Sequence, residues 1–379
     1  MSGPTPFHLP APEEQIDDLH RRLDHTRWPG ARDGWTWGTD PTLLRELVGT
    51  WRHDFDWTSW AAHLDEALPS TVTEIGGLRV QSAFRPGVGP DPFPLVLLHG
   101  WPSSFAEMAE LAGLLADPAA TGGDPVDAFD VVVPSLPGHG YSAVPDDPAY
   151  GADHCADLVR SLMVDVHGFD RFGAHGGDRG SFVSTGLGAR HPDVTAGIHL
   201  TFPGGLPADP PTDEDRVWLE EQGAYMADEG GYIAIQSTRP QTLTYGLNDS
   251  PVGLLAWLVE KWRSWSDCDG ELLRAFSADQ VLGNATIYWL TGTIGSSMHW
   301  YWAHRHAPPS AVRPVRIECP TGVAAFPHEV VHVPRSAVAR KYDLQRWTDM
   351  PRGGHFAQME QPSLLAEEIR AFFRPLRAG

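Results

Sequence analysis

The chain has 379 residues, of which 41% are hydrophobic, enough for one large domain with an insertion or for two domains. Its 49 acidic and 28 basic residues give a net charge of −21, which argues against nucleic acid or an anionic membrane surface as a partner. The three cysteines lie far apart and no stretch of about eighteen apolar residues occurs, so we expect a reduced, cytoplasmic setting and no membrane span.

Residues 1–70 are predicted to form helices without a sheet. Pro12-Glu13-Glu14 suits a first helical turn, and Ile16 and Leu23 belong to the apolar face that follows. Asp40-Pro41 provides an N-cap and a proline at the first position of a second helix. The tryptophan-rich stretch 28–37 between them must bury its rings against the rest of the chain. We therefore expect a wrapping segment and not an independent domain.

Residues 71–205 are predicted to form the first part of an α/β core. Residues 72–75 and 78–84 flank Gly76-Gly77, which indicates a hairpin with a two-residue turn. Short continuous apolar runs follow at 93–98 and 129–133, and such runs are typical of strands buried on both faces of a parallel sheet. Helical patterns alternate with these runs. The alternation predicts a doubly wound, mostly parallel sheet with ligands at the carboxyl ends of its strands.

Between residues 206 and 307 the strand pattern stops and a helical, aromatic-rich pattern replaces it. We interpret this segment as an inserted helical cap over the site. Residues 308–379 are predicted to complete the core, with a strand at 315–319 and a terminal helix around 364–373.

The candidate site is organised around Gly176-Gly177-Asp178-Arg179-Gly180. A strand-like run at 171–174 leads into it and a helical pattern leads out, which is the layout of a nucleophile elbow. Such a sharp turn needs small neighbours two residues before and after the reactive side chain, and Gly176 and Gly180 meet that need. The helix N-terminus favours an anion there. Asp178 is therefore predicted to attack carbon directly; an ordinary glycine-rich turn is the alternative.

A carboxylate nucleophile needs a histidine that activates water and an acid that orients the histidine, in the chain order nucleophile, acid, histidine. His355 follows the last strand-like run and precedes the terminal helix, which distinguishes it among 18 histidines. Glu329 follows the strand that ends near residue 319. Glu318 and Asp343 are rivals, but they lie inside strand-like runs. A solvated loop position is the alternative for both chosen residues.

His99-Gly100-Trp101-Pro102 ends the first buried strand, at the edge where a second oxyanion turn belongs. The backbone N–H groups of Trp101 and Arg179 are predicted to converge on the Asp178 oxygen that becomes an oxyanion during ester hydrolysis. A plain strand-ending turn is the alternative for an isolated HGxP.

Taken together, these motifs make the sequence resemble the microsomal-type epoxide hydrolases of the α/β-hydrolase superfamily. The resemblance runs through most of the chain, on the wrapping segment (35–60), HGWP (99–102), GGD (176–178), GYIAIQSTRP (231–240), LNDSPVGLLAW (247–257), FPHE (326–329) and RGGHF (352–356).

The resemblance implies an α/β-hydrolase fold and conversion of an epoxide to a vicinal diol through an ester on Asp178. It implies His355 as the water-activating base and Glu329 as its orienting acid. It also implies that two cap tyrosines, Tyr232 and Tyr301, donate hydrogen bonds to the epoxide oxygen. Without the resemblance, both tyrosines would be read as packing residues. The implied chemistry requires no metal or organic cofactor.

Two departures from the family pattern concern the anchor and the elbow. We expect no membrane anchor of the kind that the membrane-bound members carry, and Arg179 stands where the family usually carries tryptophan. We expect this arginine to place a cation beside Asp178 and to influence substrate preference more than reaction type.

Two other classes remain open at this stage. A haloalkane or haloacid dehalogenase also uses an elbow aspartate, and a non-catalytic binding protein could share the fold. The aromatic cap suggests a bulky, apolar epoxide, with water as co-substrate, and a homo-oligomer is compatible with the sequence. The same aromatic cap suggests a role in secondary metabolism. Lysine occurs only at Lys261 and Lys341, a bias that, with abundant Ala, Gly and Pro, indicates a GC-rich bacterial genome.

Overall fold

A nine-stranded sheet forms the centre of this computed structural model, which describes residues 3–307 and 316–377. The strand order is β1-β2-β3-β5-β4-β6-β7-β8-β9. The strands are β1 (Thr5–Phe7), β2 (Ser70–Ile75), β3 (Leu78–Arg85), β4 (Phe93–Leu98), β5 (Phe129–Pro134), β6 (Phe172–Gly176), β7 (Thr195–Leu200), β8 (Ile317–Ala325) and β9 (Tyr342–Asp349).

The sheet is parallel from β5 to β9 and antiparallel at the β1 side. The predicted hairpin is present, with Ile75 opposite Leu78 and both turn glycines at positive φ. The expectation of no strand in residues 1–70 was wrong, because Thr5–Phe7 pairs with β2. Val315, at the start of the predicted 315–319 strand, lies outside the described residues.

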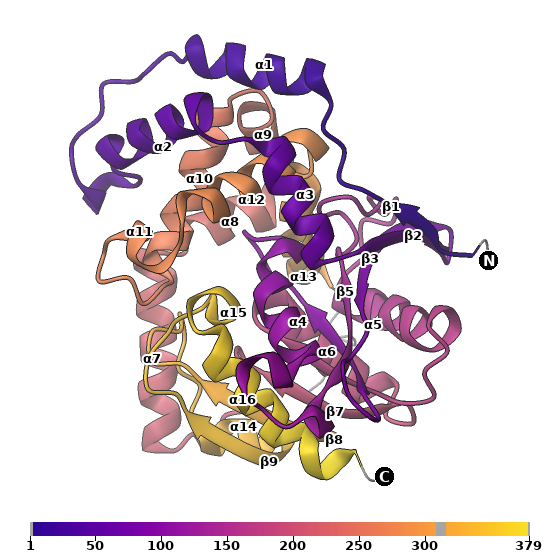
Figure 1. Ribbon diagram of the computed structural model, residues 1–379. Helices are drawn as coiled ribbons and strands as arrows, with labels where there is room; N and C mark the ends of the chain where they lie inside the picture. Colours follow the sequence, from indigo (N-terminus) through magenta and orange to yellow (C-terminus); the bar gives the residue numbers. More distant parts are fainter. Residues whose placement is uncertain (1–2, 308–315, 378–379) are drawn as a thin grey trace.

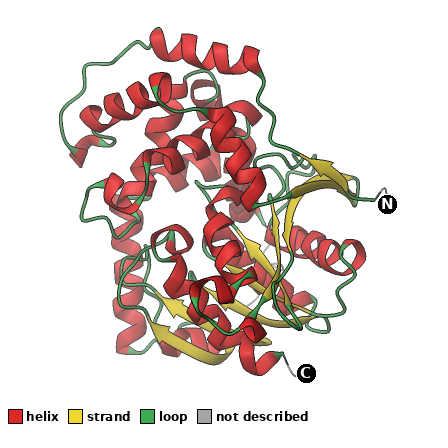
Figure 2. Ribbon diagram, in the orientation of Figure 1, coloured by secondary structure: helices red, strands yellow, loops and turns green. Residues whose placement is uncertain are grey.

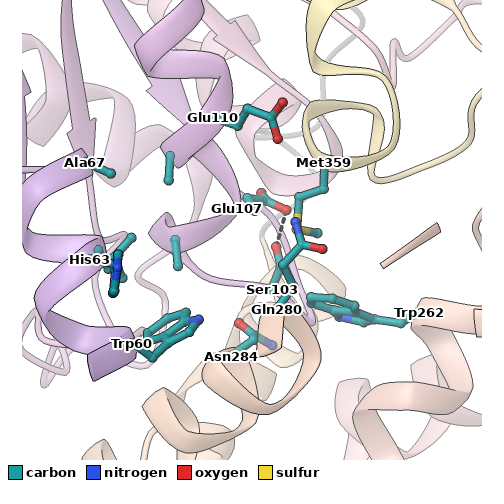
Figure 3. Close-up of a pocket in the computed structure, with 13 residues that line it drawn as sticks. Trp60, His63, Ala67, Ser103, Glu107, Glu110, Trp262, Gln280, Asn284 and Met359 are labelled. Atoms are coloured by element: carbon teal, nitrogen blue, oxygen red, sulfur yellow. Dashed lines mark hydrogen bonds between the residues drawn. The ribbon is translucent and has the colours of Figure 1, made fainter. Parts of the chain in front are cut away.

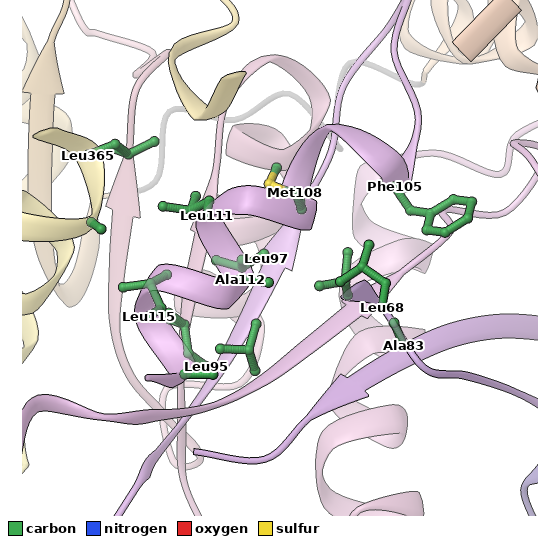
Figure 4. Close-up of a cluster of buried hydrophobic side chains, with 14 of the residues drawn as sticks. Leu68, Ala83, Leu95, Leu97, Phe105, Met108, Leu111, Ala112, Leu115 and Leu365 are labelled. Carbon is green, nitrogen blue, oxygen red and sulfur yellow. The ribbon is translucent and has the colours of Figure 1, made fainter. Parts of the chain in front are cut away.

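The central strands are buried on both faces. Leu95 and Leu97 of β4 point into one hydrophobic cluster, and Val96 and Leu98 point into another. This period of two explains why a continuous apolar run forms a strand here. Helices α4 (Ala109–Ala116) and α16 (Pro362–Phe373) cover the first face (Figure 4), and α5 (Ala152–Ser161) and α6 (Asp178–Arg190) cover the second.

A helical cap lies between β7 and β8 in the chain, and its helices α8–α10 and α12 occupy the upper half of the view in Figures 1 and 2. The α/β core with an inserted helical layer therefore has the predicted form. The cap helices are α7 (Asp213–Asp228), α8 (Gly231–Thr238), α9 (Pro240–Leu247), α10 (Pro251–Ser264), α11 (Leu272–Ala275), α12 (Ala278–Thr291) and α13 (Ile294–His306).

The N-terminal helices pack against the cap and against the core. Asp40 caps α2 as predicted, since its side chain accepts hydrogen bonds from the backbone N–H of Thr42 and Leu43. The indole Nε1 of Trp51 donates to Thr286 Oγ1 of α12 at 2.9 Å. We call residues 13–67 the strap; its helices are α1 (Glu13–Asp24), α2 (Pro41–His53) and α3 (Trp57–Ala67).

No helix of residues 3–307 and 316–377 combines the length and apolar character that crossing a bilayer demands. Short helical segments complete this part of the chain. The remaining segments are α14 (Arg335–Lys341), α15 (Ala357–Glu360), a π-helical turn (Leu162–Val166) and 3-10 turns at Trp35–Trp37, Phe105–Met108, Pro118–Thr121, Pro125–Asp127 and Arg374–Leu376.

Candidate active site

Four loops that follow parallel strands meet at one edge of the sheet. They carry Trp101 after β4, Asp178 after β6, Glu329 after β8 and His355 after β9. Carboxyl ends of parallel strands lie at the same edge, so residues more than 70 positions apart in the chain become neighbours. The structure brings these four predicted residues together: hydrogen bonds join Trp101 to Asp178 and His355 to Glu329, and His355 lies 3.7 Å from Asp178.

The elbow holds Asp178 in a strained backbone conformation. Its φ is 40°, a region that non-glycine residues rarely occupy. A Cβ on Gly176 would lie 2.3 Å from the Gly180 carbonyl carbon, and one on Gly180 would lie 2.0 Å from Leu98 O. A Cβ on Gly100 would lie 2.5 Å from Asp178 Cβ. All three positions therefore require glycine, which fits the predicted elbow.

The two oxygens of the Asp178 carboxylate face different partners. Oδ1 accepts a hydrogen bond from the Trp101 backbone N–H at 2.8 Å. Oδ2 lies 3.7 Å from His355 Nε2. The N–H of Arg179, the second predicted oxyanion donor, belongs to the first turn of α6, where backbone N–H groups have no intrahelical acceptor. The carboxylate thus has one oxygen at the oxyanion turn and one towards the base.

Glu329 orients His355. Its Oε1 lies 2.6 Å from His355 Nδ1, and both side chains are buried. Burial alone would lower the pKa of His355, but the charge and hydrogen bond of Glu329, helped by Asp178, outweigh it and raise this pKa to about 9. With Nδ1 donating to Glu329, Nε2 is the nitrogen available towards Asp178.

The cap holds the histidine loop in place. The backbone N–H of His355 donates to Trp265 O at 2.9 Å, and the Trp265 ring lies 5.0 Å from the imidazole. The N–H of Gly353 donates to Asp267 Oδ2 at 2.8 Å. Residues 265–267 connect α10 with α11, so the base is fixed by cap and core together.

Both predicted tyrosines pack on Trp101. The Tyr232 ring of α8 is stacked on it, with centroids 5.6 Å apart, and the Tyr301 ring of α13 meets it edge-on at 5.7 Å. The two tyrosine rings are 5.8 Å apart. Burial, followed by neighbouring groups that include Asp178, raises the pKa of both hydroxyls, which keeps them protonated as donors.

The Arg179 side chain is buried behind the elbow and faces away from bulk water. Its Nη1 donates to Ser297 O of α13 at 2.6 Å and lies 2.8 Å from His139 Nε2, which follows β5. The predicted cation beside the nucleophile is therefore engaged with the cap helix that carries Tyr301.

Sequence reasoning missed Glu107, a buried carboxylate behind the oxyanion turn. It accepts hydrogen bonds from Gly100 N at 3.0 Å, from Ser103 Oγ and from Gln358 Nε2 at 2.6 Å. Burial raises its pKa to about 7. Nothing in the local sequence distinguishes Glu107, because Glu110 lies in the same apolar stretch after HGWP and both carboxylates suit exposed helix positions.

A cavity of about 240 Å³ lies on the far side of this turn, between strap, cap and core (Figure 3). Glu107 and Ser103 line it from the core, Asn284 and Trp262 from the cap, and Trp60 from the strap. None of the predicted catalytic residues lines it, so it is separate from the constellation around Asp178.

Comparison with known proteins identifies the relatives of the chain. The family model described as "Epoxide hydrolase N terminus" matches residues 4–108, and the "alpha/beta hydrolase fold" model matches residues 94–241. Epoxide hydrolase 1 of Oryctolagus cuniculus is 35% identical over 407 aligned residues, which cover 97% of this chain and 88% of the relative. The chain belongs to the epoxide hydrolase family.

Solved structures of epoxide hydrolases agree with the fold of this one. The juvenile hormone epoxide hydrolase of Bombyx mori has a TM-score of 0.90 at 25% identity, covering 100% of this chain and 96% of that one. The Aspergillus niger epoxide hydrolase has a TM-score of 0.84 at 30% identity, covering 99% and 97%. The α/β-hydrolase fold, the family and the enzyme class predicted from the sequence are confirmed, and the dehalogenase and non-catalytic alternatives are not favoured.

Proposed function

We propose that this epoxide hydrolase forms its covalent ester on Asp178 and hydrolyses it with water activated by His355. The observation that carries the proposal is the split contact of one carboxylate, with Oδ1 at the Trp101 N–H and Oδ2 towards His355. An aspartate suits this work because its ester can be hydrolysed, and the proposed steps use only side chains, backbone groups and water.

In the first step, Oδ2 of Asp178 attacks a ring carbon from the face opposite the C–O bond. That bond breaks, and the ring oxygen accepts a proton from Tyr232 or Tyr301. Both tyrosine rings pack on Trp101, and the backbone N–H of Trp101 binds Asp178. This common contact supports the proposal that both hydroxyls lie close to the epoxide bound at Asp178. The product is a hydroxyalkyl ester on Asp178 and a tyrosinate.

In the second step, water attacks Cγ of Asp178 while His355 Nε2 accepts its proton. The oxyanion forms on Oδ1, where the N–H groups of Trp101 and Arg179 stabilise it. Collapse breaks the bond between Cγ and Oδ2, and the leaving oxygen takes the proton from His355. The second water proton returns to the tyrosinate, so a vicinal diol leaves and all groups are restored.

Ester formation also prepares the base. Burial lowers the pKa of His355, and Glu329 followed by the negative charge of Asp178 raises it. Esterification removes that charge, so the pKa of His355 falls when a neutral imidazole is needed. The nucleophile therefore controls the protonation of the base that later acts on it.

We further propose a bulky, apolar epoxide as substrate. Support comes from the aromatic surroundings of the constellation, where Trp101, Trp265 and Phe202 accompany the tyrosines. Three buried free cysteines support a reducing, cytoplasmic compartment. The scarcity of lysine supports a bacterial source. We also propose a role in secondary metabolism and a homo-oligomeric state.

The proposed division of the chain is the wrapping segment 1–70, the first core part 71–205, the cap 206–307 and the second core part 308–379. The loops between α3 and β2 and between β7 and α7 support the first two boundaries. The last boundary adjoins residues 308–315, which lie outside the described ones.

A single turnover in heavy-oxygen water tests the covalent step. We expect the first diol to receive an unlabelled oxygen from Asp178, and the label to appear in Asp178 itself. Mass spectrometry of the diol and of the peptide measures both. Label wholly in the first diol would contradict an ester intermediate.

His355→Gln tests the second step, because it removes the base and leaves the nucleophile. We expect the ester to accumulate as an intact-mass increase equal to the substrate. A panel of epoxides assayed for chiral diols then defines the substrate. The variant is tested while folded and with an epoxide that the unmodified enzyme converts to diol. Absence of an adduct under these conditions would contradict the role of His355.

A further inference from the structure

Arg179 carries a buried charge without the partner that such a charge normally has. The side chain is 4% exposed, and its Nη1 contacts the backbone oxygen of Ser297 and the imidazole of His139. Its Nη2 is buried with no hydrogen-bond partner among the described residues. Burial of a cation without a carboxylate is costly, so this position needs a reason beyond packing.

The guanidinium lies against the tyrosine that Ser297 helps to place. Its Cζ is 4.8 Å from the Tyr301 ring centroid and 5.2 Å from that of Trp300. Ser297 and Tyr301 are four residues apart in α13, hence on the same side of the helix. A desolvated cation is attracted to the face of an aromatic ring, and it stabilises a phenolate more than a phenol.

The second tyrosine has a weaker version of this arrangement. Lys261 Nζ is 4.8 Å from the Tyr232 ring centroid, but it also lies 2.7 Å from Glu260 and 3.7 Å from Glu229. The two carboxylates compensate its charge. Within the described residues no carboxylate forms an ion pair with the cation at Tyr301, so the two donors differ in their electrostatic support.

We propose that Arg179 is a positioning residue that acts through Tyr301: it ties α13 to the elbow and makes Tyr301 the stronger of the two donors to the ring oxygen. This inference rests on the proposed function. As the Asp178 Oδ2–carbon bond forms and the ring C–O bond breaks, the Tyr301 proton moves to the ring oxygen. The guanidinium then balances the phenolate until water restores the proton.

Of the described groups that shift the pKa of Tyr301 most strongly, Arg179 is the one that favours ionisation. Burial and the charge of Asp178 raise the pKa of Tyr301, whereas Arg179 lowers it. Burial lowers the pKa of the histidines around Arg179 and raises that of the thiol and the phenol, so these groups stay neutral. The titratable groups facing the pair are Asp178, Tyr225 and Tyr232 on the Tyr301 side, and His99, His139, Cys155 and Tyr288 on the Arg179 side.

Double-mutant cycles in the His355→Gln enzyme test the proposal, because ester formation is then the only step observed. Rapid quenching and intact mass give its rate. We expect Arg179→Gln to slow ester formation about tenfold, and to do so equally in Tyr232→Phe, but to add little in Tyr301→Phe. Arg179→Lys keeps the charge and should restore most of the rate. Equal slowing in both tyrosine variants, or no rescue by lysine, would overturn the inference.

Two comparisons distinguish failure of this inference from failure of the proposed function. If the His355→Gln enzyme with Arg179 intact forms no ester, the proposed function fails; if it forms ester and the cycles are additive, only the inference fails. Should Arg179→Gln not fold, as judged by circular dichroism, Tyr301→Phe and Tyr232→Phe with Arg179 intact decide. The first should slow ester formation about tenfold more than the second, and equal or reversed losses would contradict the role of Arg179.

Discussion

The carboxylate of Asp178 determines the charge state of its neighbour as well as the proposed attack. Its Oδ2 lies 3.7 Å from His355 Nε2, and Glu329 lies 2.6 Å from the other ring nitrogen. The imidazole therefore sits between two acidic groups in a buried site, which explains a pKa of about 9 in spite of desolvation.

Asp178→Asn should lower the pKa of His355, since it removes one of the negative charges that raise it. Glu329→Gln should lower that pKa further, because Glu329 contributes more than Asp178. An NMR titration of the histidine ring signals measures both, with His355→Gln identifying the signal among the 18 histidines. If the pKa of His355 were the same in Asp178→Asn and in the unmodified enzyme, the charge of Asp178 would not influence the protonation of His355.

The same pKa makes stability depend on pH. A histidine whose pKa rises from 6.5 to about 9 on folding stabilises the fold fully below pH 6.5, and this stabilisation is lost as the pH rises through 9. We expect the free energy of unfolding to fall by roughly 3 kcal/mol across that interval. Urea unfolding at several pH values measures it, and His355→Gln is the control in which this fall should shrink.

Local and long-range residues of the site differ in how far the sequence reveals them. Asp178 was predictable because the glycines that its turn requires lie two residues away on each side. Glu107 was not, since its burial depends on Gln358, 251 positions later. Trp265 helps to hold the His355 loop through its backbone oxygen, which accepts the hydrogen bond from the His355 N–H. No side-chain pattern can indicate a contact of that kind.

At the scale of elements, the crossing of β4, β6 and α6 is the tightest packing around the nucleophile. Gly180 of α6 rests on the backbone of Leu98 at the end of β4, and Gly176 rests on Gly180. The strand ends and the helix start are thus locked without intervening side chains. This close approach leaves no room to relieve the strain at Asp178 by a shift of the helix.

Gly180→Ala should destabilise the enzyme by several kcal/mol and reduce ester formation, because its Cβ would lie 2.0 Å from Leu98 O. Gly223→Ala in α7 is the matched control. A Cβ there meets nothing within 4 Å, and alanine in a helix should stabilise by roughly 0.5–1 kcal/mol. Thermal unfolding and turnover measure both. Similar stabilities for the two variants would contradict the close packing of the elbow.

At the scale of the whole molecule, the strap joins the two halves. α3 packs on α12 of the cap and on α4 of the core, and Trp51 is 1% exposed against the cap. A Cβ on Gly283 of α12 would lie 2.2 Å from the Trp60 ring. The strap therefore contacts both cap and core, but the expectation that the rings of residues 28–37 are buried was wrong for Trp37, which is 68% exposed.

Trp51→Ala should cost about 3–5 kcal/mol of stability and make the cap more sensitive to proteolysis. Trp37→Ala, in the same segment, should change stability by no more than about 0.5 kcal/mol, since this ring is 68% exposed. Denaturant unfolding with limited proteolysis compares the two. Equal effects would mean that burial against the cap is not what stabilises the strap.

The parts of the fold that were predictable are those with a repeating burial pattern. β4 and β5 alternate between two hydrophobic clusters, and this pattern is visible in their residues. β1 has three residues, none of them buried, and pairs with β2 through its backbone alone, so no periodicity announced it. The placement of β5 between β3 and β4 depends on pairing partners that local sequence does not specify.

The hydrogen bond from His355 N–H to Trp265 O makes the cap poorly exchangeable. A chimera that receives the cap of a relative would keep its own histidine loop. We expect the hydrogen bonds between residues 265–267 of the cap and residues 353–355 of that loop to be disturbed. Gly354 allows that loop to approach within van der Waals distance of the cap backbone. Cap swaps intended to change substrate range should therefore transplant both loops as one cassette.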